Sequence, residues 1–425
     1  MEIELRYGRG GLKVRLPEDC EPTVIEKPPM PVVADPAAAI AGALDAPVAC
    51  APLPELAAGK RSACILVCDI TRPVPNGLFL RPLIERLHAA GIPREAITVL
   101  VATGLHRPNL GEELAEVVGD PWVLENVRVE NHYARRDEDH VGLGHTRGGT
   151  VVRLNRRLVE ADLRIATGLV EPHFMAGYSG GRKVIAPGVA HAETITTFHN
   201  HRFMSHPLSA NCVLAGNPLH EEQVEIVAMI GGALALNTVI DDQRRLSFVN
   251  FGEVLASHGE AVEYVRRYAE VRLPHRFKTV LTSAAGYPLD KTYYQTVKGM
   301  VGPMDILDDD GDLIVASECS EGFGSAEFAD AQRRYVAMGR EGFLADIAAK
   351  RHADIDEWQT QMQAKPQERL RITLYSSGLG EAERALTGVT MTDSVEAAVA
   401  ESLARHGDRR IAVVPEGPYV IPCAD

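Results

Sequence analysis

Residues 163–188 read LRIATGLVEPHFMAGYSGGRKVIAPG and join a short buried-type strand to a loop rich in glycine, histidine and basic residues. The beginning of this stretch, residues 163–166, is of the kind found in strands covered on both faces. Similar runs recur at residues 63–68, 97–102, 279–282, 313–316 and 411–414. Segments of helical period lie between them, most clearly at residues 82–90, 110–118, 218–230, 254–271, 326–348 and 395–406. This alternation predicts an α/β fold with mostly parallel sheets.

The chain is long enough for two domains, and one position suggests where they meet. A long charged helix is expected to end near Arg272, because Pro274 cannot continue it. A new strand follows at residues 277–282. We therefore predict an N-terminal α/β domain over residues 1–272 and a C-terminal α/β domain over residues 273–425.

Composition excludes several kinds of partner. The 44 Lys and Arg residues against 58 Asp and Glu residues give a net charge of −14, which disfavours nucleic acid and anionic membranes. Small anions can still bind in a local basic pocket. The seven cysteines contain no C-x-x-C pair, so neither a zinc motif nor a redox motif is expected. No signal peptide and no long apolar run are recognisable, and a cytoplasmic protein is expected.

Reactive side chains follow the predicted strands at the points where those strands end. The strand at 63–68 is followed by DITRP, with Asp69 and Arg72, and the strand at 97–102 is followed by TGLHRP, with His106. Parallel sheets bind ligands beyond the carboxyl ends of their strands. His106 and His173 belong to two such loops, where two general bases can face a substrate from two sides.

The loop at residues 177–183 resembles a phosphate cradle. Gly177, Gly180 and Gly181 permit close approach of the backbone to a ligand, and Lys183 stands at the end of the loop. The pattern G-x-x-x-x-G-K-[ST] is not matched, because Val184 occupies the place of the Ser or Thr that holds Mg²⁺. Hydrolysis of ATP at a P-loop therefore loses support.

Two further segments carry candidate ligands. In FHNH, His199 and His201 are two residues apart and would diverge on a helix, so one metal ligand is more plausible than two. In the second domain, the segment after residues 279–282 places Tyr294, Gln295 and Lys298 on one helical face, where they could hydrogen-bond an anion.

Five sequence blocks occur in this order: DITRP, TGLHRP, EPHFMAGYSGGRKVIAPG, TTFHNHRF and GYPLDKTYYQTVKG. Through these blocks the chain resembles the nickel-dependent lactate racemase family. Its members racemise or epimerise 2-hydroxy acids such as lactate. The resemblance implies two α/β domains with an active-site cleft between them. It also implies a nickel-pincer nucleotide, a pyridinium-type mononucleotide with two sulfur arms that carries nickel, covalently attached to a lysine, and transient contact with cofactor maturation enzymes.

The resemblance also implies roles for individual residues. Lys183 would form the tether to the cofactor, His199 would bind nickel, and His106 and His173 would be paired acids and bases. Arg72 and Lys298 would hold the substrate carboxylate. The substrate pocket or the cofactor contacts would be completed by Tyr294, Gln295 and Trp358. The nucleotide phosphate would be supported by Asp69, Gly177, Ser179, Gly180 and Gly181. Asp69 could instead orient a neighbouring residue.

The chemistry fits these residue types. The α-proton of a 2-hydroxy acid is weakly acidic, whereas its loss as hydride leaves a planar keto acid that can be reduced on either face. The substrate itself stays open, although Arg107, Lys291 and His140 could meet a longer polar acid. Two alternatives also stay open: a hydrolase or lyase that binds a divalent metal through FHNH and His206, and a non-catalytic protein that binds small anions.

Overall fold

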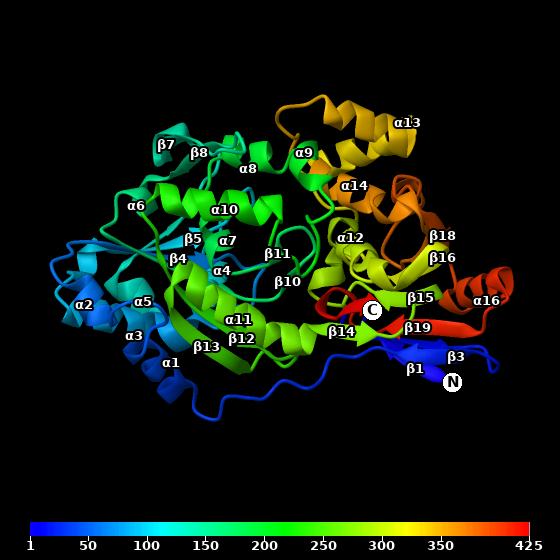
Figure 1. Cartoon of the computed structure of the whole chain (residues 1–425), viewed down its shortest axis with the longest axis horizontal. Coiled ribbons are helices and arrows are strands. Elements are labelled where there is room, and N and C mark those ends of the chain that lie inside the picture. Colours follow the sequence, from blue (N-terminus) through cyan, green and yellow to red (C-terminus); the bar gives the residue numbers. More distant parts are fainter. Residues whose placement is uncertain (425) are drawn as a thin grey trace. The chain divides into compact units, whose positions relative to one another are not determined.

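The computed structural model describes residues 1–424, and its contacts divide the chain into two compact units (Figure 1). The N-terminal unit consists of Pro29–Phe198 and Val213–Arg267. The C-terminal unit consists of Met1–Pro28, His199–Cys212 and the chain from Tyr268 onward. The chain passes from one unit to the other after residues 28, 198, 212 and 267, so residues 1–28 and 199–212 group with the C-terminal unit.

The N-terminal unit is built on a six-stranded sheet of order β13-β12-β9-β4-β5-β6. The strands are β13 (Leu246–Glu253), β12 (Leu234–Ile240), β9 (Leu163–Leu169), β4 (Ala63–Cys68), β5 (Ile97–Ala102) and β6 (Arg128–Asn131). All neighbours pair in parallel except β12 and β13. The carboxyl ends of β9, β4 and β5 therefore lie side by side at one edge of the sheet.

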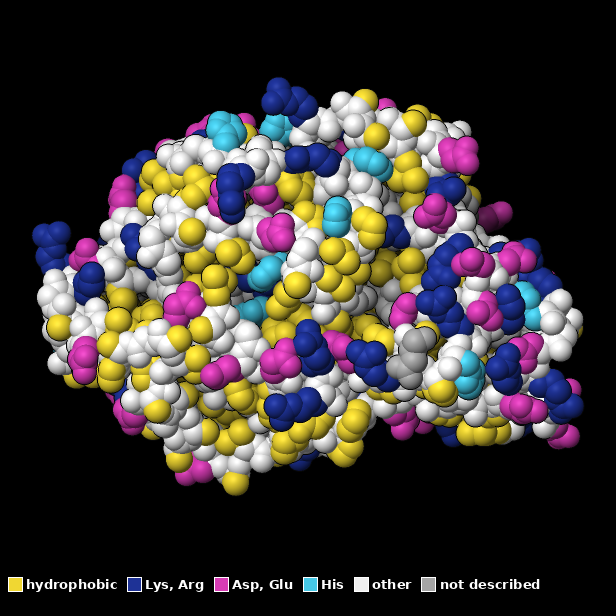
Figure 2. All heavy atoms as spheres, in the orientation of Figure 1, with side chains coloured by type: hydrophobic (Ala, Val, Ile, Leu, Met, Phe, Trp, Pro, Cys, Tyr) yellow, Lys and Arg dark blue, Asp and Glu magenta, His cyan; other side chains and the backbone are white. Residues whose placement is uncertain are grey.

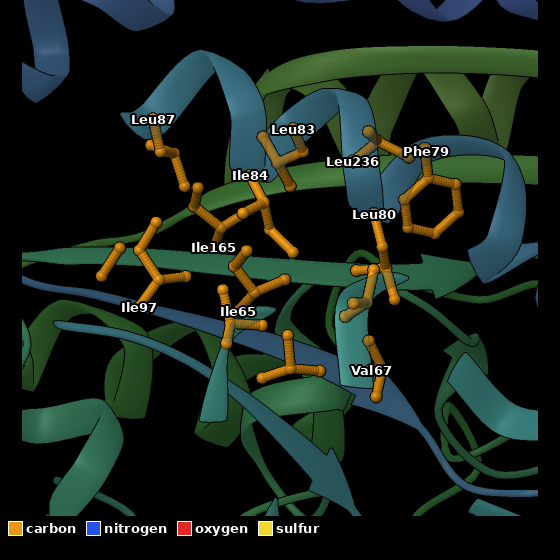
Figure 3. Packing of buried hydrophobic residues seen from close by; sticks show 14 of the residues in the cluster. Ile65, Val67, Phe79, Leu80, Leu83, Ile84, Leu87, Ile97, Ile165 and Leu236 are labelled. Carbon is orange, nitrogen blue, oxygen red and sulfur yellow. The ribbon is translucent and has the colours of Figure 1, made fainter. Parts of the chain in front are cut away.

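One apolar core fixes these strands against helix α3 (Asn76–Ala89). The buried face of α3 recurs at helical spacing and consists of Phe79, Leu80, Leu83, Ile84 and Leu87. Figure 3 shows this face packed on strand residues that include Ile65, Ile165 and Leu236. The other helices of the unit are α1 (Pro36–Asp45), α2 (Leu53–Ala57), α4 (Glu112–Val118), α5 (Pro121–Asn126), α6 (Arg156–Val159), α7 (Arg182–Ile185), α8 (Ala192–Phe198), α10 (Pro218–Met229) and α11 (Val254–Ala269).

Two hairpins complete the N-terminal unit: β7 (His140–His145) with β8 (Val151–Asn155), and β10 (Pro172–His173) with β11 (Gly177–Tyr178). The helix expected to reach Arg272 ends at Ala269. The reason is that β14 (Glu270–Leu273) pairs in parallel with β20 (Ile421–Ala424), which takes these residues out of the helix.

The C-terminal unit has a second six-stranded sheet, of order β18-β17-β16-β15-β19-β3 and parallel throughout. Its strands are β18 (Thr390–Thr392), β17 (Arg371–Tyr375), β16 (Leu307–Ala316), β15 (Phe277–Ser283), β19 (Arg410–Val414) and β3 (Glu21–Val24). The antiparallel pair β1 (Glu2–Leu5) and β2 (Leu12–Arg15) packs in the same core. The predicted α/β class with mostly parallel sheets is confirmed.

Helices of the C-terminal unit are α9 (His201–Met204), α12 (Tyr293–Val301), α13 (Ala326–Ala348), α14 (Glu357–Ala364), α15 (Glu381–Arg384) and α16 (Val395–His406). Gly339 interrupts α13 with a non-helical φ of 71°, so the segment expected as one helix is two. Across residues 1–424, no helix combines the length and apolar character required to span a membrane. Figure 2 shows basic and acidic side chains interspersed over the visible face.

Candidate functional site

In the N-terminal unit, the ends of β4 and β5 bring a carboxylate and an imidazole together. Asp69 follows β4 directly, and His106 follows β5 after a short turn. Asp69 Oδ2 lies 2.6 Å from His106 Nδ1, and Asp69 Oδ1 accepts from the Thr71 hydroxyl at 2.6 Å. Asp69 is only 5 % exposed, whereas the His106 side chain is 55 % exposed. The carboxylate is therefore buried behind an imidazole that is open to ligands.

The charge state of Asp69 sets the tautomer of His106. Burial favours the neutral acid, yet hydrogen bonds and charge from His106, with the Thr71 hydroxyl, hold the pKa of Asp69 below its usual value. An ionised carboxylate can only accept hydrogen bonds, so the Nδ1 proton of His106 is donated to Asp69. In the neutral imidazole this leaves Nε2 without a proton and able to accept one.

His173 has the opposite arrangement. It lies on β10, paired with Gly177 of β11, and is 8 % exposed. Its Nδ1 accepts from the backbone N–H groups of Ala176 at 3.2 Å and Met175 at 3.4 Å. Nδ1 is therefore unprotonated, and in the neutral ring Nε2 carries the proton. The two histidines consequently present different functions at Nε2, an acceptor on His106 and a donor on His173.

Arg72 and Glu171 join the loops that follow β4 and β9. Arg72 Nε lies 3.4 Å from Glu171 Oε1, and both side chains are about one quarter exposed. The Glu171 N–H donates to the Ser179 hydroxyl, which in turn donates to Leu169 O at 2.7 Å. Sequence reasoning did not select Glu171, although it stands two residues before His173 in the same loop.

Lys183 lies in α7, at the end of the glycine-rich loop, and is half-buried. Burial lowers the pKa of its ammonium to about 7, and the charges of Arg72 and Arg182 act in the same direction. A substantial fraction of the amine is therefore neutral at neutral pH, which is the form that reacts as a nucleophile.

Arg182 is a fully buried cation beneath the same loop, and its partners are all neutral. Its guanidinium donates to Tyr178 O at 3.0 Å, to Ala176 O at 2.9 Å and to His220 Nδ1 at 2.8 Å, and it lies 2.9 Å from His258 Nε2. Burial, together with the charge of Arg182, lowers the pKa of His220 to about 4. Arg182 therefore ties the loop to the body of the unit while placing positive charge beside Lys183.

Gly177 and Gly181 lie so close to other protein atoms that neither position has space for a side chain. A Cβ at Gly177, where φ is 76°, would lie 2.3 Å from Val213 O, and one at Gly181 would lie 2.9 Å from the His258 ring. These positions require glycine for conformation and for packing. Contact of Gly177, Ser179, Gly180 and Gly181 with a phosphate stays a prediction.

In the C-terminal unit, α12 starts beyond the carboxyl end of β15 and carries Tyr294, Gln295 and Lys298. All three are half-buried, while Tyr293 and Val297 point into the core. The Oε1 atom of Gln295 is buried and finds no hydrogen-bond partner in the described part of the chain. A buried acceptor of this kind is costly unless something donates to it, which is consistent with a ligand site on this helix.

His199 and Trp358 form a second group in the C-terminal unit. Their ring centroids are 5.0 Å apart with an interplanar angle of 44°, and both rings are more than nine-tenths buried. His199 lies two residues before α9, whereas Trp358 lies in α14, far away in the sequence. The predicted metal ligand therefore packs on the predicted pocket tryptophan.

Other candidates are used differently. Arg107 makes two contacts of 2.6 Å with Glu113, Lys291 pairs with Glu321 at 2.5 Å, and His140 is buried with Nδ1 2.6 Å from Arg136 O. Each of these three side chains thus already has a partner within the fold. Within residues 1–424, no group of three or more His, Cys, Asp or Glu side chains is placed to hold a metal ion.

The structure therefore gathers Asp69, Arg72, His106 and Lys183 with the His173 loop at one edge of the N-terminal sheet. In the C-terminal unit it places Tyr294, Gln295 and Lys298 on α12 and joins His199 to Trp358. Sequence reasoning missed Glu171, His220 and His258, and it noted Arg182 only as standing with Lys183 at the end of the glycine-rich loop. Nothing local in the sequence marks the two histidines.

Comparison with known proteins identifies the family. The lactate racemase N-terminal domain matches residues 7–211, and the lactate racemase C-terminal domain matches residues 274–422. A lactate racemase from Thermoanaerobacterium thermosaccharolyticum is 30 % identical over 99 % of this chain and 98 % of its own. A lactate racemase from Lactiplantibacillus plantarum is 30 % identical over 89 % of each chain.

Solved structures agree with the sequence matches. The lactate racemase apoprotein from T. thermosaccharolyticum superposes with a TM-score of 0.90 at 29 % identity, covering 99 % of this chain and 100 % of that one. A Thermotoga maritima protein shares the fold with a TM-score of 0.65 at 18 % identity, over 87 % of this chain and 97 % of its own. The chain belongs to the lactate racemase family and is an isomerase.

Proposed function

We propose that this enzyme interconverts the stereoisomers of a 2-hydroxy acid at C2, with lactate as the first substrate to test. The observation that carries the proposal is the pair of histidines with different functions at Nε2, one backed by a buried carboxylate. A site that only binds an anion needs cations, and it has no use for Asp69 2.6 Å behind an exposed imidazole. The names of the relatives support the same substrate class.

The histidines handle the protons of the substrate oxygen. His106 accepts the hydroxyl proton at Nε2, and the resulting imidazolium is stabilised by Asp69. His173, with its proton on Nε2, donates to the oxygen when the hydroxyl is formed again, and exchange with solvent then restores both rings. Since the planar keto acid can be reduced on either face, two imidazoles allow each stereoisomer its own acid and base.

Arg72 and Lys298 are proposed to bind the substrate carboxylate. A guanidinium offers a planar fork that suits a carboxylate, and an ammonium adds a point charge. Glu171 holds Arg72 through Nε, and Arg72 Nη1 donates to Thr71 O at 3.2 Å, so the guanidinium is anchored in the loop after β4. Tyr294 and Gln295, on the same helix as Lys298, are proposed to complete the pocket.

The residues of the chain fit a nickel-pincer nucleotide. Lys183, with a pKa of about 7, has the neutral amine that a covalent tether requires. A lone histidine, His199, suits a metal whose other ligands come from the cofactor, and it agrees with the absence of a larger ligand cluster in residues 1–424. When bound, this group would supply the hydride acceptor for the reaction. Asp69 is assigned to His106, and the loop at 177–181 to the nucleotide phosphate.

The proposal implies a cytoplasmic protein that meets cofactor maturation enzymes before it becomes active. It is tested by co-expression with those enzymes, followed by intact mass, nickel content and peptide mapping around Lys183. We expect an adduct of mononucleotide size on Lys183, nickel in matching amount, and interconversion of D- and L-lactate. Lys183→Ala should lack the adduct. A wild-type protein that stays unmodified under conditions that load a known lactate racemase would refute the cofactor assignment.

A further inference from the structure

Helix α14, sequence EWQTQMQA, is unusual because all eight of its residues are buried although most of them are polar. A buried amide costs free energy unless it is hydrogen-bonded, so each glutamine needs a partner. Those partners show what the helix holds in place.

One face of α14 contacts the segment that contains the proposed nickel ligand. Trp358 packs on the His199 ring, and three residues later Gln361 Nε2 lies 2.9 Å from His201 Nδ1 and 3.4 Å from His201 O. Residues three apart lie on the same side of a helix. Just beyond the helix, Lys365 Nζ donates to Ser209 O at 3.0 Å, so this residue also contacts the segment of residues 199–212.

Another face of α14 contacts α12, the helix that carries Tyr294, Gln295 and Lys298. Gln359 Nε2 donates to Tyr294 O at 2.6 Å, and Gln363 Oε1 accepts from the Tyr293 hydroxyl at 2.9 Å. Gln363 also donates to Thr387 O at 2.6 Å and accepts from Gln332 Nε2 at 2.7 Å. The two glutamines Gln361 and Gln363 therefore serve different segments from one short helix.

The hydrogen bond to His201 constrains the residue two positions before it. An amide nitrogen only donates, so His201 Nδ1 accepts from Gln361 and carries no proton. Between the histidines, Asn200 caps α9 by accepting from Phe203 N and donates through Nδ2 to Arg351 O at 2.8 Å. The backbone on the carboxyl side of His199 is thus held at two successive residues, while Trp358 limits the tilt of its ring.

We propose that Gln361 is a positioning residue for the metal ligand: through His201 it fixes the backbone that presents the His199 imidazole against Trp358. This inference rests on the proposed role of His199 in the nickel site. Partners that orient a metal ligand in this way are typically worth about 10- to 100-fold in metal affinity or activity.

The test compares Gln361→Met with Gln363→Met, a matched loss of a buried glutamine on the same helix. The chain has two tryptophans, so Trp122→Phe leaves Trp358 as the only reporter. In the apoprotein, we expect acrylamide to quench Trp358 more strongly in Gln361→Met than in Gln363→Met. In the loaded enzyme, we expect nickel to be lost to a chelator about 10- to 100-fold faster in Gln361→Met.

Equal quenching and equal nickel loss in the two variants would overturn the proposal. If neither variant folds, the wild-type protein still decides, because the imidazole ¹⁵N shifts of His201 report its tautomer; a proton on Nδ1 would contradict the hydrogen bond from Gln361. The fluorescence and NMR measurements need no cofactor. A wild type that acquires no nickel would therefore count against the proposed function while leaving the role of Gln361 measurable.

Discussion

The amine of Lys183 should titrate more than three pH units below an ordinary lysine. With a pKa of about 7, half of it is neutral at pH 7. An ordinary lysine, with a pKa near 10.4, is neutral to only about 0.04 % at that pH, so the neutral fraction differs about a thousandfold. A less basic amine is also less nucleophilic. With a Brønsted slope like that of thiols, about 0.45, the net gain in reactivity is roughly 30-fold.

The assay is competitive labelling of the apoprotein with limiting acetic anhydride from pH 6 to pH 11, read by peptide mass. Lys183 is half-buried, so the pH midpoint decides the test rather than the absolute rate. We expect a midpoint near pH 7 for Lys183. Lys350 is the control, because its hydrogen bonds to Asp354 and Glu357 outweigh burial and raise its pKa. If the labelling midpoint of Lys183 were the same as that of Lys350, the reasoning would be refuted. Such a result would mean that burial beside Arg182 does not destabilise the ammonium of Lys183.

Three further expectations concern the site and its loop. His106→Ala and His173→Ala should each abolish racemisation and leave the adduct mass unchanged; normal turnover in either variant would remove that residue from the mechanism. Asp69→Asn should preserve the fold and lower kcat by up to about 10⁴-fold. A loss of this size is known for serine proteases in which the carboxylate that sets the tautomer of the catalytic histidine is replaced. An unchanged kcat would contradict the tautomer assigned to His106. Gly177→Ala should lower the free energy of unfolding, measured in urea, by about 1–3 kcal/mol more than Gly231→Ala does. Both glycines have a φ near 77°, but only at Gly177 would a new Cβ clash with a neighbouring atom, Val213 O. Equal losses in the two variants would show that the contact relaxes.

The sequence carried enough information for the fold class and for the edge of the sheet where chemistry gathers. Short buried strands and the residues just after them predict that Asp69, Arg72, His106 and His173 lie at the same edge of a sheet. Which atoms pair was not predictable. The 2.6 Å contact of Asp69 with His106 requires β4 and β5 to be neighbours in register, which depends on packing across the sheet.

Features set by long-range packing escaped sequence reasoning. His220 and His258 contact Arg182 from helices about 40 and 80 residues away, so no local pattern marks them. Gln361 contacts His201 across 160 residues for the same reason. The end of α11 was also missed, because the parallel partner of residues 270–273 lies at the far end of the chain.

The pairing of β3 with β19 has a consequence for biosynthesis. Residues 21–24 align with residues 410–413, so the N-terminal strand leaves the ribosome almost 390 residues before its partner exists. All segments of the N-terminal unit have been translated by residue 267, whereas residues 21–24 must wait until residues 410–413 have been made. Contacts this distant in sequence form late, and an unpaired strand edge is prone to aggregate meanwhile. Tags or fusions at the amino terminus should therefore affect the yield of folded protein more than insertions in surface loops of the N-terminal unit.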